Sequence, residues 1–404
     1  MDADTKNMIK DILSSNDVAF VIGNGINQHF FSDVKSWQKL LESLWIRYCQ
    51  NTSSNDWERF VDSKTGYLRG ITPTELFDLI EMNYYGSNTP SGLLRLLQQR
   101  NIPPIKFKEL DSIAKAGLKE FDLKSFGKAN VNFGQEFDKF TQTNSIFIEK
   151  CRNWCNENIA IDTNTLSDGD CVLIMMELLS NSTKIQLYRN QLKKDIANEY
   201  QPDKKDVNLG SFMKKIANRE APVLTTNFDT YMSSSLGLEL FKMESGFTDF
   251  YPWNVYFSNH PLRSPISGFA VWHINGLRNY HRSIRLGLSD YMGSVQRARN
   301  MIHFNNMNEF FDGKNRENWI GHNTWLHIVF NKPLFIFGLA LNENEVFLRW
   351  LLIQRAKYSK MYGRDLRGWF VDKNINDGKR VFLETLGFTV VSVKDFKELY
   401  DAFN

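Results

Sequence analysis

Residues 18–27 read VAFVIGNGIN, and the fold follows from this stretch. Val18–Ile22 is a short apolar run, rich in β-branched and aromatic residues and without alternating polar positions. Such a run predicts a central strand of a parallel sheet, because a parallel sheet is covered by helices on both faces. The strand passes directly into a glycine-rich turn at Gly23, and helical spacing of apolar residues begins near Trp37. A buried strand, a tight turn and a helix together predict an α/β fold.

Further strands are expected downstream, with helices between them. The predicted strands are 222–226, 253–257, 269–273, 334–337, 368–371 and 388–393, and the clearest predicted helices are 343–362 and 395–403. This alternation predicts a doubly wound, Rossmann-like and mostly parallel sheet. Residues 51–218 have mainly helical patterning instead. We therefore predict a discontinuous sheet domain made of residues 1–50 and 219–404, with a large α-helical insertion at 51–218.

The composition is that of a soluble globular protein. The chain has 404 residues, of which 42% are hydrophobic and 24% charged, which is enough for two domains with a sizeable core. Its formal net charge of +3 favours neither nucleic acid nor a membrane surface as a partner. The N-terminus lacks the basic start of a signal peptide, and no apolar run is long enough to span a bilayer. The expected location is the cytoplasm.

Four segments at predicted strand ends carry polar or glycine residues. The turn with Gly23 and Gly25 lets the backbone approach a pyrophosphate closely, although Gln28 stands where a third glycine is usual. The alternative is a tight turn without a ligand. Residues 225–229 read TTNFD, and buried polar groups of this kind need hydrogen-bond partners. They belong either to a ligand site or to a helix cap.

The other two segments follow later strands. Residues 271–276 read VWHING, and His273 in this position is a natural general base, with a structural histidine as the alternative. Residues 334–343 read LFIFGLALNE, a strand that ends in Gly338 and leads into a long helix. The alternative here is simple packing of the helix on the strand. Because ligands collect at the carboxyl ends of strands in open α/β sheets, all four segments are candidates for one site.

The order of these four segments resembles the sirtuin superfamily. The resemblance implies NAD as the ligand, with Asn227 at the nicotinamide ribose and His273 as the catalytic histidine. The residues that it places at the cofactor are Gly23, Asn24, Gly25, Ile26, Asn27, Thr226, Asp229, Gly338 and Leu339. In addition, Trp37 and the segment 288–291 (LSDY) resemble features of bacterial sirtuin-like defence proteins.

Departures from the sirtuin pattern refine the expected activity. Protein-deacylating sirtuins carry a four-cysteine zinc module after the catalytic histidine, whereas no cysteine follows Cys171 here. None of the four cysteines forms a C-x-x-C pair, so we expect reduced thiols and no metal. Ala340 and Glu343 also replace residues that are usual in the late strand end. The resemblance therefore implies an NAD hydrolase, with NAD as substrate and water as nucleophile, and not a lysine deacylase.

Partners and regulation follow from the same resemblance. Similar bacterial proteins deplete NAD in antiphage defence, and in size and architecture the chain looks most like the sirtuin-like partner of a HerA-type ATPase. A homo-oligomer is expected for the same reason, and the helical insertion is the candidate for assembly or gating. Two alternatives stay open: a non-catalytic NAD or ADP-ribose sensor, and a nucleic-acid-associated subunit that uses the arginines at 278–299 and 349–367.

Overall fold

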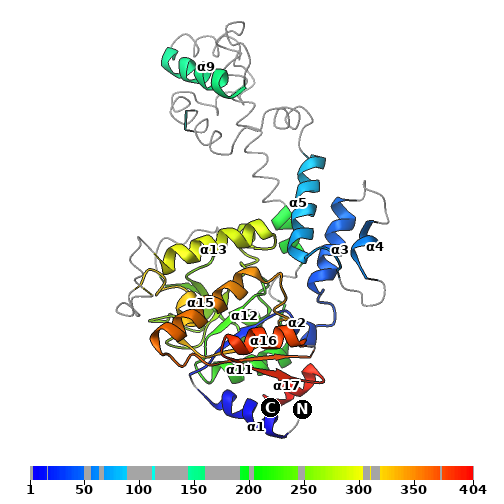
Figure 1. Cartoon of the computed structure of the whole chain (residues 1–404), viewed down its shortest axis with the longest axis vertical. Helices are drawn as coiled ribbons and strands as arrows, with labels where there is room; N and C mark the ends of the chain where they lie inside the picture. Colours follow the sequence, from blue (N-terminus) through cyan, green and yellow to red (C-terminus); the bar gives the residue numbers. More distant parts are fainter. Residues whose placement is uncertain are drawn as a thin grey trace. The chain divides into compact units, whose positions relative to one another are not determined.

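The computed structural model describes residues 3–15, 17–49, 56–62, 68–88, 112–113, 144–159, 192–199, 204–243, 251–303, 310, 319–373 and 375–403 (Figure 1). The chain divides into two units. Unit 1 comprises Met1–Glu81 and Leu192–Asn404, and unit 2 comprises Met82–Gln191. Unit 2 lies within the segment 51–218 that the sequence predicts as an insertion. The flanking parts of that segment, which include α4 (Asp56–Phe60) and α11 (Val207–Ala217), belong to unit 1.

All the described strands belong to unit 1, and from residue 334 onward strands and helices alternate. In chain order the described elements are α1 (Ala3–Ser14), β1 (Ala19–Ile22), α2 (Gly25–Phe30), α3 (Trp37–Tyr48), α4 (Asp56–Phe60), α5 (Pro73–Asn88), α9 (Ser145–Ile159), α11 (Val207–Ala217), β2 (Val223–Thr225), α12 (Tyr231–Leu236), β3 (Glu239–Lys242), β4 (Val255–Ser258), β5 (Val271–His273), the 3₁₀ helix η4 (His281–Ser283), α13 (Leu288–Ile302), α14 (Leu326–Asn331), β6 (Leu334–Phe337), α15 (Val346–Tyr362), β7 (Gly368–Asp372), α16 (Asp377–Thr385), β8 (Phe388–Ser392) and α17 (Phe396–Ala402).

The strands form one eight-stranded sheet in the order β3-β4-β5-β2-β1-β6-β7-β8. The six strands from β5 to β8 in this order are parallel, and β4 and β3 add an antiparallel edge. Taken by their place in the chain, the parallel strands follow the order 3-2-1-4-5-6 of dinucleotide-binding sheets. The α/β prediction with a doubly wound, mostly parallel sheet is thus confirmed.

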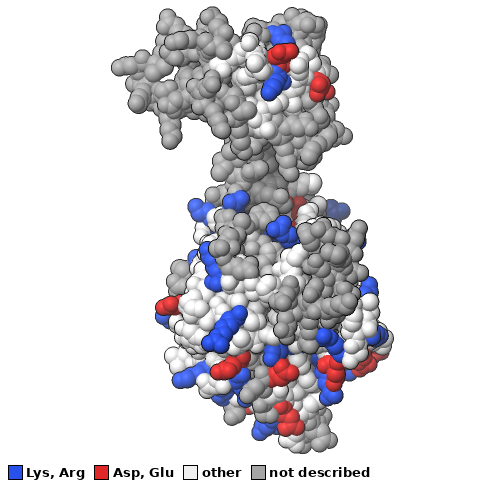
Figure 2. All heavy atoms as spheres, turned by 90° about the vertical axis from the view of Figure 1, so that its left-hand side faces the viewer, with Lys and Arg blue, Asp and Glu red and all other residues white. Residues whose placement is uncertain are grey.

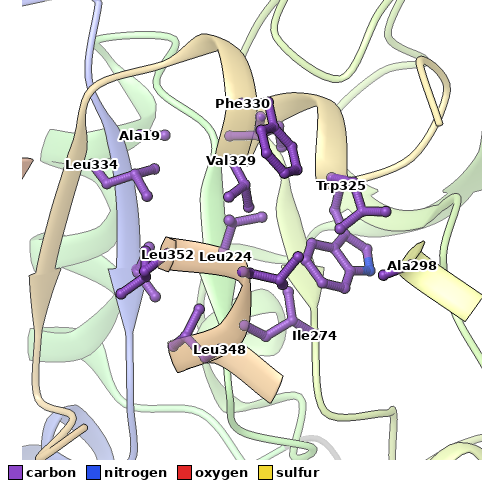
Figure 3. Packing of buried hydrophobic residues seen from close by; sticks show 14 of the residues in the cluster. Ala19, Leu224, Ile274, Ala298, Trp325, Val329, Phe330, Leu334, Leu348 and Leu352 are labelled. Atoms are coloured by element: carbon purple, nitrogen blue, oxygen red, sulfur yellow. The ribbon is translucent and has the colours of Figure 1, made fainter. Parts of the chain in front are cut away.

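Strand β1 is buried on both faces, as its unbroken apolar run predicts. Ala19 and Val21 belong to a core that α13, α14 and α15 close on one face of the sheet (Figure 3). Phe20 points to the opposite face, where its ring contacts Phe335 and Phe403. Alternate side chains of β1 therefore pack into two separate hydrophobic layers, one on each face of the sheet. An alternation of apolar and polar residues would instead have indicated a strand with one face exposed to solvent.

One strand differs from the sequence prediction. β3 has the sequence ELFK and is mostly exposed, so it carries no apolar run that would have marked it. It forms through its pairing with β4 at the edge of the sheet. Among the described residues, no helix has the length and apolar character needed to cross a membrane.

Candidate functional site

All four segments that carry polar or glycine residues lie on the same side of the sheet, at the carboxyl ends of its parallel strands. β1, β2, β5 and β6 are parallel neighbours, so the loops that follow them meet at their carboxyl ends. The chain continues from β1 to one side through β2 and β5, and to the other side through β6, β7 and β8. The carboxyl ends of β1 and β6 therefore mark the point where strand order reverses, the usual place of ligands in such sheets.

His273 and Asn227 are brought into direct contact there. The His273 Nδ1 atom lies 2.7 Å from the main-chain oxygen of Asn227. A carbonyl oxygen only accepts, so Nδ1 carries the proton and Nε2 keeps its lone pair. This Nε2 is buried and has no hydrogen-bond partner among the described residues. Burial lowers the pKa of His273 to about 4, against the smaller opposite effect of the bond to Asn227. The ring is therefore a neutral acceptor at neutral pH.

Asn27 and Asp229 form a second buried pair at this edge. Asn27 Nδ2 donates to Asp229 Oδ2 over 2.7 Å, while the main-chain N–H of Tyr231 donates to Oδ1 over 3.1 Å. Asp229 thus caps the start of α12, as the cap interpretation predicts, and it also orients Asn27. Its role in a ligand site stays a prediction. The Asn27 Oδ1 atom is left buried without a donor in the described part of the chain.

Asn227 is held by its neighbours on β1 and β2. Its main-chain N–H donates to Thr225 Oγ1 over 3.1 Å, and its Nδ2 donates to the Gly23 oxygen over 3.4 Å. The partly exposed Thr226 donates its main-chain N–H to Ile22 O over 3.2 Å. The loop after β2 is therefore fixed on the end of β1 and the first turn by hydrogen bonds to two main-chain oxygens.

The glycine turn packs against the loop that follows β6. Gly23 N donates to Phe337 O over 3.1 Å, and Gly25 N donates to Gly338 O over 2.8 Å. A Cβ atom on Gly23 would lie 2.7 Å from the Leu339 Cβ, and one on Gly25 would lie 2.8 Å from the Gly338 Cα. The protein's own backbone thus fills the space beside both glycines, and their contact with a pyrophosphate stays a prediction.

The two neighbours of Gly25 lie differently. Asn24 turns outward and donates from Nδ2 to Lys35 O over 3.1 Å, which fixes the loop before α3. Ile26 is fully buried in the core. Both side chains are thus engaged by other parts of the protein, and their contact with a cofactor stays a prediction.

Gly23→Ala is expected to destabilise the protein by about 1–3 kcal/mol, because the added methyl group meets backbone that has no room to move. Gly293→Ala is the matched control. Gly293 lies in α13 with no atom near the position of an added Cβ, so alanine should stabilise the helix by about 0.5–1 kcal/mol. Urea unfolding of both variants measures this difference. Equal effects would mean that the glycine turn is not closely packed.

The stability that Asp229 contributes is expected to depend on pH. Burial raises its pKa to about 6, although hydrogen bonds from Tyr231 and Asn27 and the charge of Arg278 act in the opposite direction. A raised carboxyl pKa favours the folded state at low pH, and this contribution is lost as pH rises through about 6. We therefore compare the free energy of unfolding of Asp229→Asn with that of the wild type at two pH values. The variant's advantage should be larger at about pH 8 than at about pH 5, by on the order of 1 kcal/mol.

Urea denaturation of both proteins at the two pH values checks this prediction. His273 is present in both proteins, so its own titration, which weakens the fold as pH falls from its ordinary 6.5 toward about 4, cancels in the comparison. A stability difference that is the same at both pH values would contradict it.

Sequence reasoning missed a cluster of polar residues beside the end of β5. Asn275 Nδ2 donates to the Tyr291 hydroxyl over 3.4 Å, and the Tyr251 hydroxyl donates to the Ile274 main-chain oxygen. Glu345 is partly exposed, yet burial of its carboxyl raises its pKa to about 7, and its charge acts on Tyr291. No local pattern could indicate this cluster, since its members come from four separate segments.

No group of three histidine, cysteine, aspartate or glutamate side chains that could hold a metal ion occurs in the described part of the chain. The sequence matches no protein-family model and no curated protein.

Proposed function

We propose that the protein hydrolyses the bond between nicotinamide and ribose in NAD, releasing nicotinamide and ADP-ribose. One observation carries the proposal: His273 Nε2 and Asn27 Oδ1 are buried acceptors at the carboxyl ends of the strands, and neither has a donor among the described residues. An unpaired buried acceptor is costly, and ribose hydroxyls or a bound water supply the donors that both atoms lack. The ordered resemblance of the four segments to sirtuins supports NAD as the source of that ribose.

The proposed reaction requires one proton transfer to a side chain of the protein. The bond from ribose C1′ to the pyridinium nitrogen breaks with its electron pair, so nicotinamide leaves neutral and the sugar carries the positive charge. Water then forms the new bond to C1′ and must lose one proton. His273 Nε2 is placed to accept that proton, directly or through a ribose hydroxyl, and to pass it to solvent. The neutral state of the ring suits this role, because a protonated His273 has no lone pair to offer.

Asn227 is assigned the positioning of the ribose or water. Its contacts to Gly23 and Thr225 hold the loop rigid, and its main-chain oxygen fixes the orientation of the His273 ring. Groups held in this way lower the entropic cost of bringing water and C1′ together. Asp229 acts one step further away, through Asn27.

The second candidate is a non-catalytic sensor of NAD or ADP-ribose. The close packing of the glycine turn on Gly338 and the capping role of Asp229 favour it, since both need no reaction to explain them. Such a sensor, however, would use the Nε2 lone pair of His273 only to accept a hydrogen bond from its ligand, whereas the hydrolase also uses it to accept a proton from water. We therefore rank it below the hydrolase.

A nucleic-acid-associated subunit fits less well. Several arginines that suggested it have partners inside the protein: Arg285 pairs with Asp290, Arg355 bonds main-chain oxygens, and Arg349 donates to Leu341 O and stacks on Phe382. On the face that Figure 2 shows, lysine and arginine side chains lie interspersed with aspartate and glutamate. A phosphate backbone is bound more strongly by an uninterrupted basic surface.

The biological setting is proposed from resemblance alone. We assign the chain to antiphage defence by NAD depletion in the cytoplasm, as a homo-oligomer that acts with a HerA-type ATPase. A hydrolase of this kind needs control, because unregulated loss of NAD is harmful to the cell that makes it.

The test is the chromatographic detection of nicotinamide and ADP-ribose from NAD, with the purified full chain alone and with a co-encoded ATPase. Equal amounts of both products support hydrolysis. Binding of ADP-ribose without release of nicotinamide under either condition supports the sensor. If neither binding nor release occurs, the NAD proposal is wrong.

A further inference from the structure

The chain crosses between the two units twice. It leaves unit 1 within α5, at Glu81, and it returns at Leu192. The residues that follow, 192–199, are helical over 192–198, and we call them the return segment. The first part of the outgoing crossing, residues 73–81 of α5, and the whole return segment belong to unit 1, so their contacts there are defined.

The outgoing crossing contacts the first turn of α13. Asp78 on α5 accepts a hydrogen bond from the main-chain N–H of Leu288 over 3.1 Å. Burial raises the pKa of Asp78, while the N–H groups of Leu288 and Ser289 lower it. The residue before α13 is Gly287, which has no side chain to cap the helix. Asp78 therefore supplies the cap from another helix.

The return segment contacts the same turn from another element. Lys193 Nζ lies 2.9 Å from both carboxylate oxygens of Asp290 and donates to Ile284 O over 2.7 Å. The side chains of Lys193 and Asp290 are only 4% and 7% exposed. Removal of one partner of such a buried ion pair strongly destabilises the folded protein, so this contact has little freedom to shift.

The residues just before α13, together with its first turn, are in turn bonded to the loop that follows His273. Arg285 N donates to Asn275 O over 2.9 Å, and Leu277 N donates to Ser283 Oγ over 2.9 Å. With the bond from Asn275 to Tyr291, residues 274–291 form one hydrogen-bonded block directly after β5.

Two further contacts join the return segment to the other loops of the site. Arg278 donates from Nε to Ala197 O over 3.0 Å, and its main-chain N–H donates to Phe228 O over 2.6 Å, between Asn227 and Asp229. Glu199 pairs with Lys35 over 2.9 Å, and the main-chain oxygen of Lys35 holds Asn24 of the glycine turn.

We propose that the first turn of α13 and the return segment couple unit 2 to the candidate site. Both crossings contact this turn. The return segment contacts the loop after β5 directly at Arg278, and it reaches the loops after β2 and β1 through Arg278 and Lys35. A partner or ligand that acts on unit 2 would thereby alter the position of His273, and by reciprocity a ligand at the site would alter both crossings. The inference depends on the proposed function only for the ligand at the site.

The alternative is that these contacts are ordinary packing, each acting only on its neighbours. Hydrogen exchange of the full chain, followed by mass spectrometry, separates the two. Asp78→Asn removes the charge of the outgoing contact and keeps an acceptor in its place. Lys332→Met is the control for the loss of one charge, because Lys332 forms an ion pair with Asp17 in the loop before β6.

Coupling predicts that Asp78→Asn speeds exchange by about fivefold or more at 274–286 and in the return segment, as well as at 287–291. Lys332→Met should leave these segments unchanged. An effect of Asp78→Asn confined to 287–291 would overturn the proposal. Lys193→Met tests the return contact in the same way, and if it fails to fold by circular dichroism, the Asp78→Asn result decides.

A second arm uses saturating ADP-ribose with the wild-type chain. Coupling predicts slower exchange at 192–199 and at 73–81, beyond the loops after β1, β2, β5 and β6. Protection that stays within those loops contradicts coupling and leaves the NAD proposal intact. Absence of any protection counts against the NAD proposal, while the variant arm still decides on coupling.

Discussion

His273→Ala is expected to lower the rate of nicotinamide release from NAD by at least about 100-fold. The alanine variant has no group in place of Nε2, the buried acceptor that is proposed to take the proton from water. Because the proton moves only as the reaction proceeds, kcat should fall while KM changes little. Steady-state kinetics with the purified full chain, followed by chromatography, measures both constants.

His260→Ala is the control for this experiment. His260 is exposed on the loop after β4 and forms none of the contacts described for the site, so its removal should leave the rate unchanged. Near-normal turnover by His273→Ala would show that the histidine is structural, which is the alternative that the sequence left open. A large rise in KM with unchanged kcat would instead assign His273 to substrate binding.

Arg355→Met is expected to destabilise the protein by about 3–5 kcal/mol, the largest effect on folding that we predict. Arg355 is 1% exposed and donates to four main-chain oxygens, those of Val329, Lys332, Leu366 and Arg367. Its guanidinium thereby ties α15 to the end of α14 and to the residues before β7. Methionine fills much of the same volume, but it leaves these oxygens without their charged donor.

Arg367→Met serves as the comparison for this variant. Arg367 pairs with Asp365 over 2.7 Å, yet both side chains are about two-thirds exposed. Such a pair contributes little, so the change in unfolding free energy should stay within about 0.5 kcal/mol. Urea denaturation of the two variants beside wild type gives the difference. Equal stabilities of the two variants would contradict the structural role of Arg355.

The sequence identified most of the sheet because its parallel strands are buried on both faces. Runs such as 334–337 (LFIF) and 18–22 (VAFVI) have no polar positions, and they coincide with β6 and β1 within one residue. β3 was not predicted, because an exposed strand at the edge of a sheet needs no apolar run. The helix predicted at 343–362 begins instead at Val346, after a turn in which Leu341 has a positive φ of 48°. That turn depends on tertiary contacts, which local patterns do not reveal.

For the candidate site, the sequence by itself determined which residues stand at strand ends, among them Gly23, Asn227, His273 and Gly338. Strand ends follow from apolar periodicity, which is a local property. Only the tertiary structure decided which of these residues touch: His273 bonds the main chain of Asn227, and Asn27 bonds Asp229 across 202 positions of the chain. The same holds for the two buried acceptors that have no donor in the described part of the chain, and for the two crossings that both contact the first turn of α13. The physical reason is that burial and pairing depend on contacts between distant segments, and those contacts exist only once the sheet has formed.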